Sequence, residues 1–169
     1  MILFFAKGEC DSDALVKYCY SHYADITGAK NSLPRKVEIV RAYGEKPRFG
    51  DGVPAHFSVS HSHGVVMVGI SHTEIGVDIE KIRPVNYSKF SFIEAEDEGD
   101  FFRKWTERES YLKFTGVGLK DFRAPIPEDA HFEHFDVFDD YDACVCAEEQ
   151  DIVAYMIDLS EVRSGESAE

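Results

Sequence analysis

Two carboxylates stand in alternation with apolar residues in the stretch Ile75-Gly76-Val77-Asp78-Ile79-Glu80. In a strand, Asp78 and Glu80 would project from one face, and Val77 and Ile79 from the other. Carboxylates one strand repeat apart, about 7 Å between Cα atoms, can converge on one hard cation. Taken alone, the alternation also fits a half-exposed strand with a polar outer face. The stretch is therefore a candidate metal site that needs support from other groups.

A third acidic group lies in a helix predicted over residues 100–115. At helical spacing this helix carries an apolar stripe made of Phe101, Phe102, Trp105 and Leu112. Glu109 falls inside the stripe, whereas Arg103 and Glu107 fall elsewhere and fit ordinary solvated charges. Because an ionised carboxylate among apolar groups is costly, Glu109 needs a cation or hydrogen-bond donors. Lys113, one turn on, can supply that charge, although a simple surface pair of the two residues is the alternative.

Hydroxyl and imidazole groups gather at the end of a strand in Phe57-Ser58-Val59-Ser60-His61-Ser62-His63-Gly64. Alternation puts the serines on the face opposite Phe57, and His61 follows directly after Ser60. Small hydroxyls and an imidazole before a glycine suit phosphate oxygens, and Lys46 precedes them by a short connection. A strand that merely ends in a Ser/His turn is the alternative. Zinc is disfavoured, because the nearby acidic pair offers the oxygen ligands that Mg²⁺ prefers and no cysteine joins the histidines.

The elements that must position these groups follow from hydrophobic periodicity and turn residues. Helices are predicted from Asp11 or Ser12 to about Ile26 and over residues 100–115. Strands are predicted over residues 1–6, 37–40, 56–60, 65–71, 75–82, 131–138, 143–147 and 152–157. This mixture predicts an α+β fold with mostly antiparallel sheet and a long central helix. The order helix, strand, strand recurs, so we expect two similar lobes, residues 1–72 and 73–169, with a cleft between them.

Composition excludes several classes of protein. The 169 residues carry 32 acidic and 18 basic side chains, a formal charge of −14. This balance argues against nucleic-acid binding, which depends on Lys and Arg. No apolar run approaches the roughly 20 residues of a membrane span, and the apolar start, residues 1–6, reads as a strand and not a signal peptide. The four cysteines lack metal or disulfide spacing, which predicts free thiols and a cytoplasmic protein.

Taken together and in order, these stretches resemble the 4′-phosphopantetheinyl transferase superfamily. The matching segments are Gly44-Glu45-Lys46-Pro47, Phe57-Ser58-Val59-Ser60-His61-Ser62, Gly76-Val77-Asp78-Ile79-Glu80, Trp105-Thr106-Glu107-Arg108-Glu109-Ser110-Tyr111-Leu112-Lys113 and Gly116-Val117-Gly118-Leu119. Each segment is weak alone, but their occurrence in register across residues 44–119 is specific.

The resemblance implies a role for each matched residue. It assigns Mg²⁺ to the three acidic residues Asp78, Glu80 and Glu109, and the coenzyme A phosphates to Lys46, Ser60, His61 and Lys113. Glu109 and Lys113 are the implied catalytic residues, Glu109 as a base and Lys113 as a stabiliser of phosphate charge.

The implied reaction is Mg²⁺-dependent transfer of the phosphopantetheine arm of coenzyme A to a serine of an apo acyl or peptidyl carrier protein. Its products are the holo-carrier and 3′,5′-ADP. Because both halves of the cleft lie in one chain, we expect a monomer. Two alternatives stay open: a Mg²⁺-dependent phosphohydrolase that uses the same acids, and a weak relative that binds coenzyme A or a carrier protein without turnover.

Overall fold

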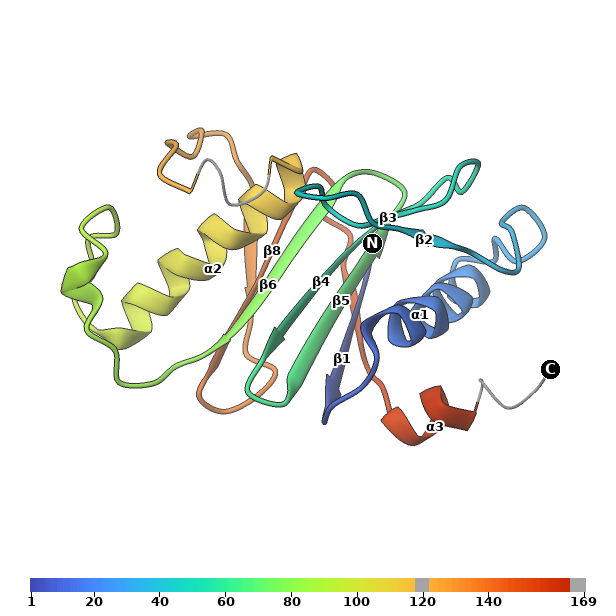
Figure 1. Ribbon diagram of the computed structural model, residues 1–169, viewed down its shortest axis with the longest axis horizontal. Coiled ribbons are helices and arrows are strands. Elements are labelled where there is room, and N and C mark those ends of the chain that lie inside the picture. The colour runs from blue at the N-terminus through green and yellow to red at the C-terminus, as the bar shows by residue number, and fades with distance from the viewer. Residues whose placement is uncertain (118–121, 165–169) are drawn as a thin grey trace.

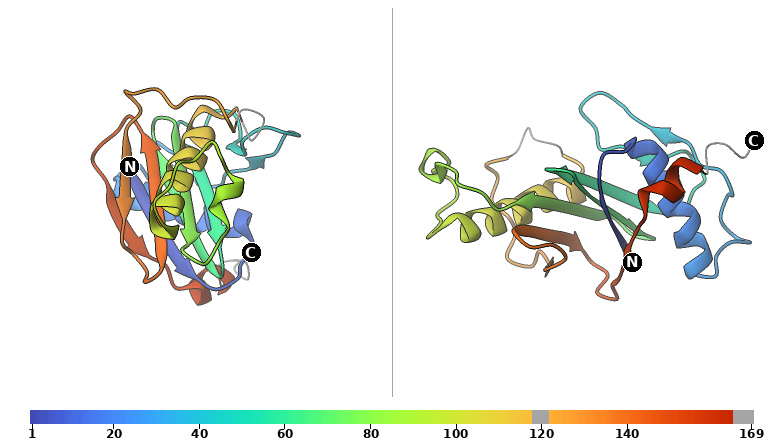
Figure 2. Two further views of the ribbon diagram at one scale, coloured as in Figure 1. Left: turned by 90° about the vertical axis from the view of Figure 1, so that its left-hand side faces the viewer. Right: turned by 90° about the horizontal axis from the view of Figure 1, so that it is seen from below.

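The computed structural model describes residues 1–117 and 122–164, so Gly118 and Leu119 of the last matched segment lie outside the described residues. Figure 1, and the view from below in Figure 2, show helices α1 and α2 at opposite ends of a row of strands. The strands are β1 (Ile2–Lys7), β2 (Ile39–Val40), β3 (Arg48–Phe49), β4 (His56–Ser62), β5 (Val65–Ser71), β6 (Ile75–Lys81), β7 (Phe132–Phe135), β8 (Tyr141–Ala147) and β9 (Val153–Met156). The helices are α1 (Ser12–Ile26), the short 3₁₀ helix Tyr87–Lys89, α2 (Glu98–Thr115) and α3 (Leu159–Ser164).

Two main sheets form the centre of the protein. The first has the order β4-β5-β1-β9 and the second β6-β8-β7, while β2 and β3 form a separate ribbon. Among the described strands, all pairings are antiparallel except that of β1 with β9. The α+β class and the mostly antiparallel sheet are thereby confirmed. The similarity of the two lobes and the boundary after residue 72 stay predictions, and β9, from the later part of the chain, returns to pair with β1.

Strand alternation divides the apolar side chains between two cores. On β1, Ile2 and Phe4 pack into a core shared with α1, whereas Leu3 and Phe5 pack into a second core. The second core also takes the odd-numbered apolar residues of β6 and β8. The even-numbered residues of these two strands consequently face away from this core, toward α2.

Helix α2 begins and ends at residues suited to those positions. The side chain of Asp97 accepts a hydrogen bond from the amide of Asp100 at 2.8 Å, which caps the first turn. Gly116 ends the helix with φ of +72°, a conformation that glycine adopts without a steric penalty. α1 is capped in the same way by Asp11.

The predicted elements agree well with the observed ones in the middle of the chain. β5 has the expected bounds, α2 begins two residues earlier than expected, and β4 extends two residues further. The ribbon strand β3 and helix α3 were not predicted, because each is too short to show a period. The four cysteines are thiols outside any disulfide, as expected. Among the described residues, none of the helices combines the length and apolar character that a membrane crossing requires.

Candidate functional site

Asp78 lies on β6 under α2 and is almost completely buried, with 3% of its surface exposed. Its Oδ1 accepts two hydrogen bonds, from Ser60 Oγ at 2.6 Å and from Lys113 Nζ at 2.7 Å. Its Oδ2 is buried without a hydrogen-bond partner. Because an unpaired carboxylate oxygen is costly inside a protein, this atom is suited to a cation.

The serines of β4 connect the two sheets where they meet. Ser58 Oγ accepts a hydrogen bond from the amide of Val77 at 3.0 Å. Ser62 Oγ accepts one from the amide of Lys81 at 3.1 Å and donates to Glu80 Oε2 at 2.7 Å. The serine hydroxyls of β4 therefore accept hydrogen bonds from backbone amides along the edge of β6. They also donate hydrogen bonds to both carboxylates of that strand.

The three predicted acidic residues influence one another electrostatically. Burial raises the pKa of Glu109 to about 6, and repulsion from Asp78 and Glu80 adds to this rise against the opposing effect of Lys113. Burial also raises the pKa of Glu80, and the charge of Asp78 contributes. The pKa of Asp78 is raised by burial, although Lys113 and Ser60 oppose the shift. Two cations lie within ion-pair distance of these three carboxylates, Lys113 at Asp78 and Arg83 at Glu80 (3.6 Å), so the acidic charges outnumber the basic ones by one.

Whether these residues fit a magnesium ion can be tested on the donor atoms. Carboxylate oxygens are the ligands Mg²⁺ prefers, and it keeps waters and substrate phosphates as its remaining ligands. Within residues 1–117 and 122–164, no group of three His, Cys, Asp or Glu side chains forms a complete metal cluster. The unpaired Asp78 Oδ2 and the mutual repulsion nevertheless fit a cation that is completed by phosphate oxygens.

A cavity of about 610 Å³ opens beside these groups and brings together four predicted site residues: Lys46, His61, Glu109 and Lys113. Of the other predicted residues, Ser60, Asp78 and Glu80 are not part of the described lining. Ser60 Oγ instead donates a hydrogen bond to Asp78 Oδ1. In this arrangement the hydroxyl of Ser60 stabilises the carboxylate of Asp78 by a direct hydrogen bond.

Lys46 and His61, which both line the cavity, are each held by a neighbouring group. Lys46 Nζ donates to Glu74 Oε2 at 2.9 Å and to the carbonyl of Ile75 at 2.7 Å. His61 Nε2 lies 2.9 Å from Ser12 Oγ at the start of α1. Burial and the charge of Lys113 lower the pKa of His61. Both residues are fixed at the cavity before any ligand binds.

Two lining residues carried no signal in the sequence. Ser12 and Arg41 line the same cavity, and Arg41 Nη2 donates to Asp13 Oδ1 at 2.5 Å. Neither belongs to a matched segment. Ser12 reaches the cavity from the start of α1, and Arg41 from the connection between β2 and β3. Only the spatial approach of these segments could identify them.

Sequence comparison relates the chain to curated 4′-phosphopantetheinyl transferases, although no family model matches it. It is 33% identical over 116 residues to psf-1 of Bacillus pumilus, covering 58% of this chain and 50% of that protein. It is 34% identical over 87 residues to Sfp of Bacillus subtilis (strain 168), and 34% identical over 93 residues to HetI of Nostoc sp.. Both matches cover 44% of this chain and 39% of the relative.

The chain thus spans about half the length, or less, of these three relatives. The matches confirm the resemblance to the 4′-phosphopantetheinyl transferase superfamily that the sequence segments predict.

Proposed function

We propose, from the similarity to the 4′-phosphopantetheinyl transferases, that this chain transfers the phosphopantetheine arm of coenzyme A to a serine of an apo carrier protein. The observation that carries the proposal is that the acidic residues and the phosphate-binding candidates lie next to each other. An acidic group with an unpaired buried oxygen lies beside a cavity lined by Lys46, His61 and Lys113. Such a cavity offers cations and an imidazole to phosphates next to carboxylates that favour a metal.

The transfer exchanges one P–O bond for another. The serine oxygen of the carrier forms a bond to the β-phosphorus of coenzyme A, the bond from that phosphorus to the leaving oxygen breaks, and 3′,5′-ADP departs. The serine proton must leave during this step. Glu109 is the candidate acceptor, because its carboxylate borders the cavity and its raised pKa of about 6 makes it a stronger base than an ordinary glutamate.

The remaining residues bind and orient. Lys113, which lines the cavity, is placed to stabilise negative charge on the transferring or leaving phosphate. Lys46 and His61 are suited to hold the phosphates of coenzyme A at the other wall. Mg²⁺, held by Asp78, Glu80 and Glu109, would neutralise charge on the pyrophosphate when bound. An acyl or peptidyl carrier as acceptor, a cytoplasmic location and a monomeric state belong to the same proposal.

The direct test is to incubate the protein with coenzyme A, Mg²⁺ and a panel of apo carrier proteins, and to weigh the carriers by mass spectrometry. We expect at least one carrier to gain the mass of one phosphopantetheine arm. The gain should disappear with a chelator and fall at least 100-fold in Glu109→Gln, because that variant keeps the shape of the side chain but loses the base and ligand.

Three outcomes would contradict the proposal in different ways. Release of inorganic phosphate without an acceptor would indicate a phosphohydrolase. Binding of coenzyme A with no mass gain on any carrier would indicate a module that binds without turnover. A gain that survives in Glu109→Gln would leave the transferase intact but remove Glu109 as the base.

A further inference from the structure

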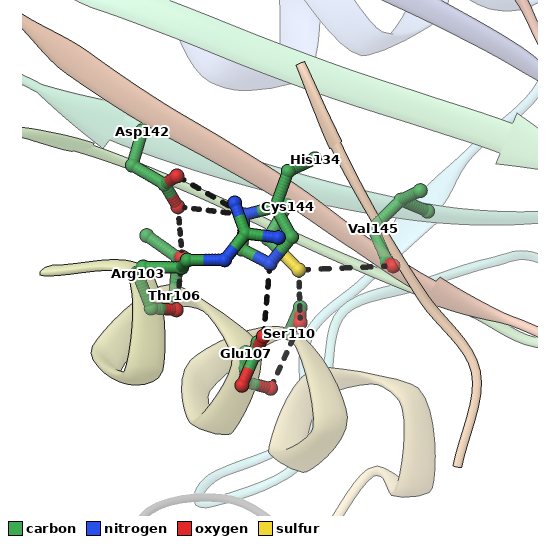
Figure 3. A network of polar contacts seen from close by, with 8 residues as sticks. All are labelled: Arg103, Thr106, Glu107, Ser110, His134, Asp142, Cys144 and Val145. Carbon is green, nitrogen blue, oxygen red and sulfur yellow. Dashed lines mark hydrogen bonds and ion pairs between the residues drawn. The ribbon is translucent and has the colours of Figure 1, made fainter. Parts of the chain in front are cut away.

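A partly buried polar cluster joins α2 to the second sheet through residues that do not line the cavity. Figure 3 shows its members: Thr106, Glu107 and Ser110 from α2, His134 from β7, and Asp142 and Cys144 from β8. His134 is central, with its Nδ1 at 3.0 and 3.1 Å from the two oxygens of Asp142. Its Nε2 lies 3.0 Å from Glu107 Oε1. The histidine therefore bridges a carboxylate of the sheet and a carboxylate of the helix.

The geometry of this bridge fixes the protonation state of the ring. Both ring nitrogens face carboxylate oxygens, which only accept hydrogen bonds when ionised. A neutral imidazole can donate from one nitrogen only, so only the imidazolium satisfies both carboxylates. Burial of the ring lowers its pKa, but the hydrogen bonds to Asp142, Cys144 and Glu107 outweigh burial and raise the pKa to about 11.

Two further contacts on the same side of α2 support the bridge. Thr106 Oγ1 donates a short hydrogen bond to Asp142 Oδ2, and Ser110 Oγ donates to Cys144 Sγ at 3.5 Å. The helix is thus attached to β8 and β7 at three positions within about one turn. Polar attachments of this kind fix orientation more narrowly than apolar packing, because each hydrogen bond has a restricted direction.

The sheet connects this cluster directly to the acidic residues of the site. In the register of the strands, His134 is opposite Cys144, and Cys144 is opposite Asp78. In the neighbouring position Asp142 is opposite Glu80. Opposite residues of antiparallel strands lie about 5 Å apart on the same face of the sheet. Adjacent residues across the sheet therefore connect the cluster to the acidic residues of the site, and α2 lies over both.

We propose that His134 is a positioning residue, which bridges Glu107 and Asp142 so that α2 presents Glu109 and Lys113 to Asp78 and Glu80. The inference rests on the proposed function and adds a residue outside the matched segments to it. The bridge has a second effect: it places one positive charge between two carboxylates next to the acidic residues of the site. Without His134, Asp142 and Glu107 would add their repulsion to that of the acidic residues of the site.

The test compares His134→Gln, which keeps the polar shape without the charge, with the matched control His131→Gln. His131 is exposed and lies shortly before β7, so its replacement leaves the cluster intact. In the carrier assay we expect His134→Gln to lower kcat at least tenfold and to change KM for coenzyme A less than threefold, because Lys46 and His61 are untouched. His131→Gln should stay within twofold in both parameters. A kcat of His134→Gln within twofold of wild type would overturn the inference.

Hydrogen exchange of the α2 amides, measured without substrate, separates this inference from the transferase proposal. Exchange at least tenfold faster in His134→Gln than in His131→Gln supports the positioning role, and equal exchange overturns it, even if the wild type transfers nothing. If His134→Gln does not fold, the double variant His134→Gln/Asp142→Asn, which leaves one unpaired acid fewer, is used for both measurements. Absence of transfer in the wild type would count against the proposed function alone.

The pH dependence of stability gives a prediction with a definite sign. The groups that face His134 are Asp142 and Cys144 from β8 and Glu107 from α2, with Arg103 one turn before Glu107 on the same helix. Because its folded pKa of about 11 exceeds the unfolded value of about 6.5, the stabilisation is fully present below pH 6.5 and is lost as pH rises to 11.

We therefore expect the stability difference between wild type and His134→Gln, from denaturant unfolding, to be largest at pH 6 and smallest at pH 10.5. A difference that stays constant over this range would show that the ring is not held as an imidazolium.

Discussion

Replacement of Gly76 by alanine is expected to unfold the protein or to lower its free energy of unfolding by at least about 3 kcal/mol, because α2 lies directly on this residue. A Cβ atom at position 76 would lie 1.8 Å from the carbonyl oxygen of Ser110 and 2.4 Å from the amide nitrogen of Phe114. Both are backbone atoms of a helix, so neither can rotate aside as a side chain would. To accept the methyl group, α2 would have to move away from β6 and take Glu109 and Lys113 with it.

The matched control is Gly50→Ala. A Cβ there would lie 3.6 Å from Glu38 Cβ, an ordinary contact, so we expect a change within about 0.5 kcal/mol. Denaturant unfolding of both variants, followed by circular dichroism, makes the comparison. A Gly76→Ala protein as stable as Gly50→Ala would show that α2 does not lie as closely on β6 as the structure places it.

Part of the site could be predicted from the sequence because strands and helices have fixed side-chain periods. A strand has a period of two, so the alternation in β6 alone indicated that Asp78 and Glu80 share a face and that Val77 and Ile79 enter the core. Helical periodicity likewise placed Glu109 in the apolar stripe of its helix with Lys113 one turn on, whereas only the family resemblance brought them to Asp78 and Glu80. Local periodicity is sufficient wherever one element determines the direction of its own side chains.

Contacts between elements could not be predicted in this way. The sequence predicts that the serines of β4 face phosphate oxygens. In the structure their hydroxyls form hydrogen bonds to β6, and that of Ser60 donates to Asp78. β4 and β6 belong to different sheets and are joined through side chains, not by backbone hydrogen bonds between the strands. No sequence pattern therefore predicts that they are in contact.

Glu107 illustrates the same limit on the helix. Its position outside the apolar stripe suggested an ordinary solvated charge, which is wrong: its carboxylate is paired with His134. His134 lies 27 residues further on, in a strand where no sequence motif marks it as a partner of Glu107. Long-range pairing of this kind becomes visible only when the strands and the helix are assembled.

Replacement of Lys113 by methionine should destabilise the protein by about 3 kcal/mol, because it removes the cation from a buried carboxylate. Asp78 has a side-chain exposure of 4% and Lys113 of 27%, so the pair is shielded mainly on the acidic side. Breaking a buried ion pair costs about 3–5 kcal/mol, and the partial exposure of Lys113 favours the lower end. Methionine keeps the length and apolar stem of the side chain, so the loss is chiefly one of charge.

A double-mutant cycle distinguishes the lost charge from lost packing. In Asp78→Asn/Lys113→Met the carboxylate is neutral, so we expect at least half of the lost stability to return, measured by urea unfolding with a chelator present. Transfer to the carrier should not return, because both the acidic ligand and the phosphate-stabilising cation are gone. The more exposed pair Lys104–Asp100 within α2, with a similar N–O distance of 2.8 Å, provides the control: Lys104→Met should leave stability close to that of wild type. If the double variant is no more stable than Lys113→Met, packing and not the buried charge of Asp78 explains the loss, and the unpaired oxygen of Asp78 would no longer argue for a cation at this site.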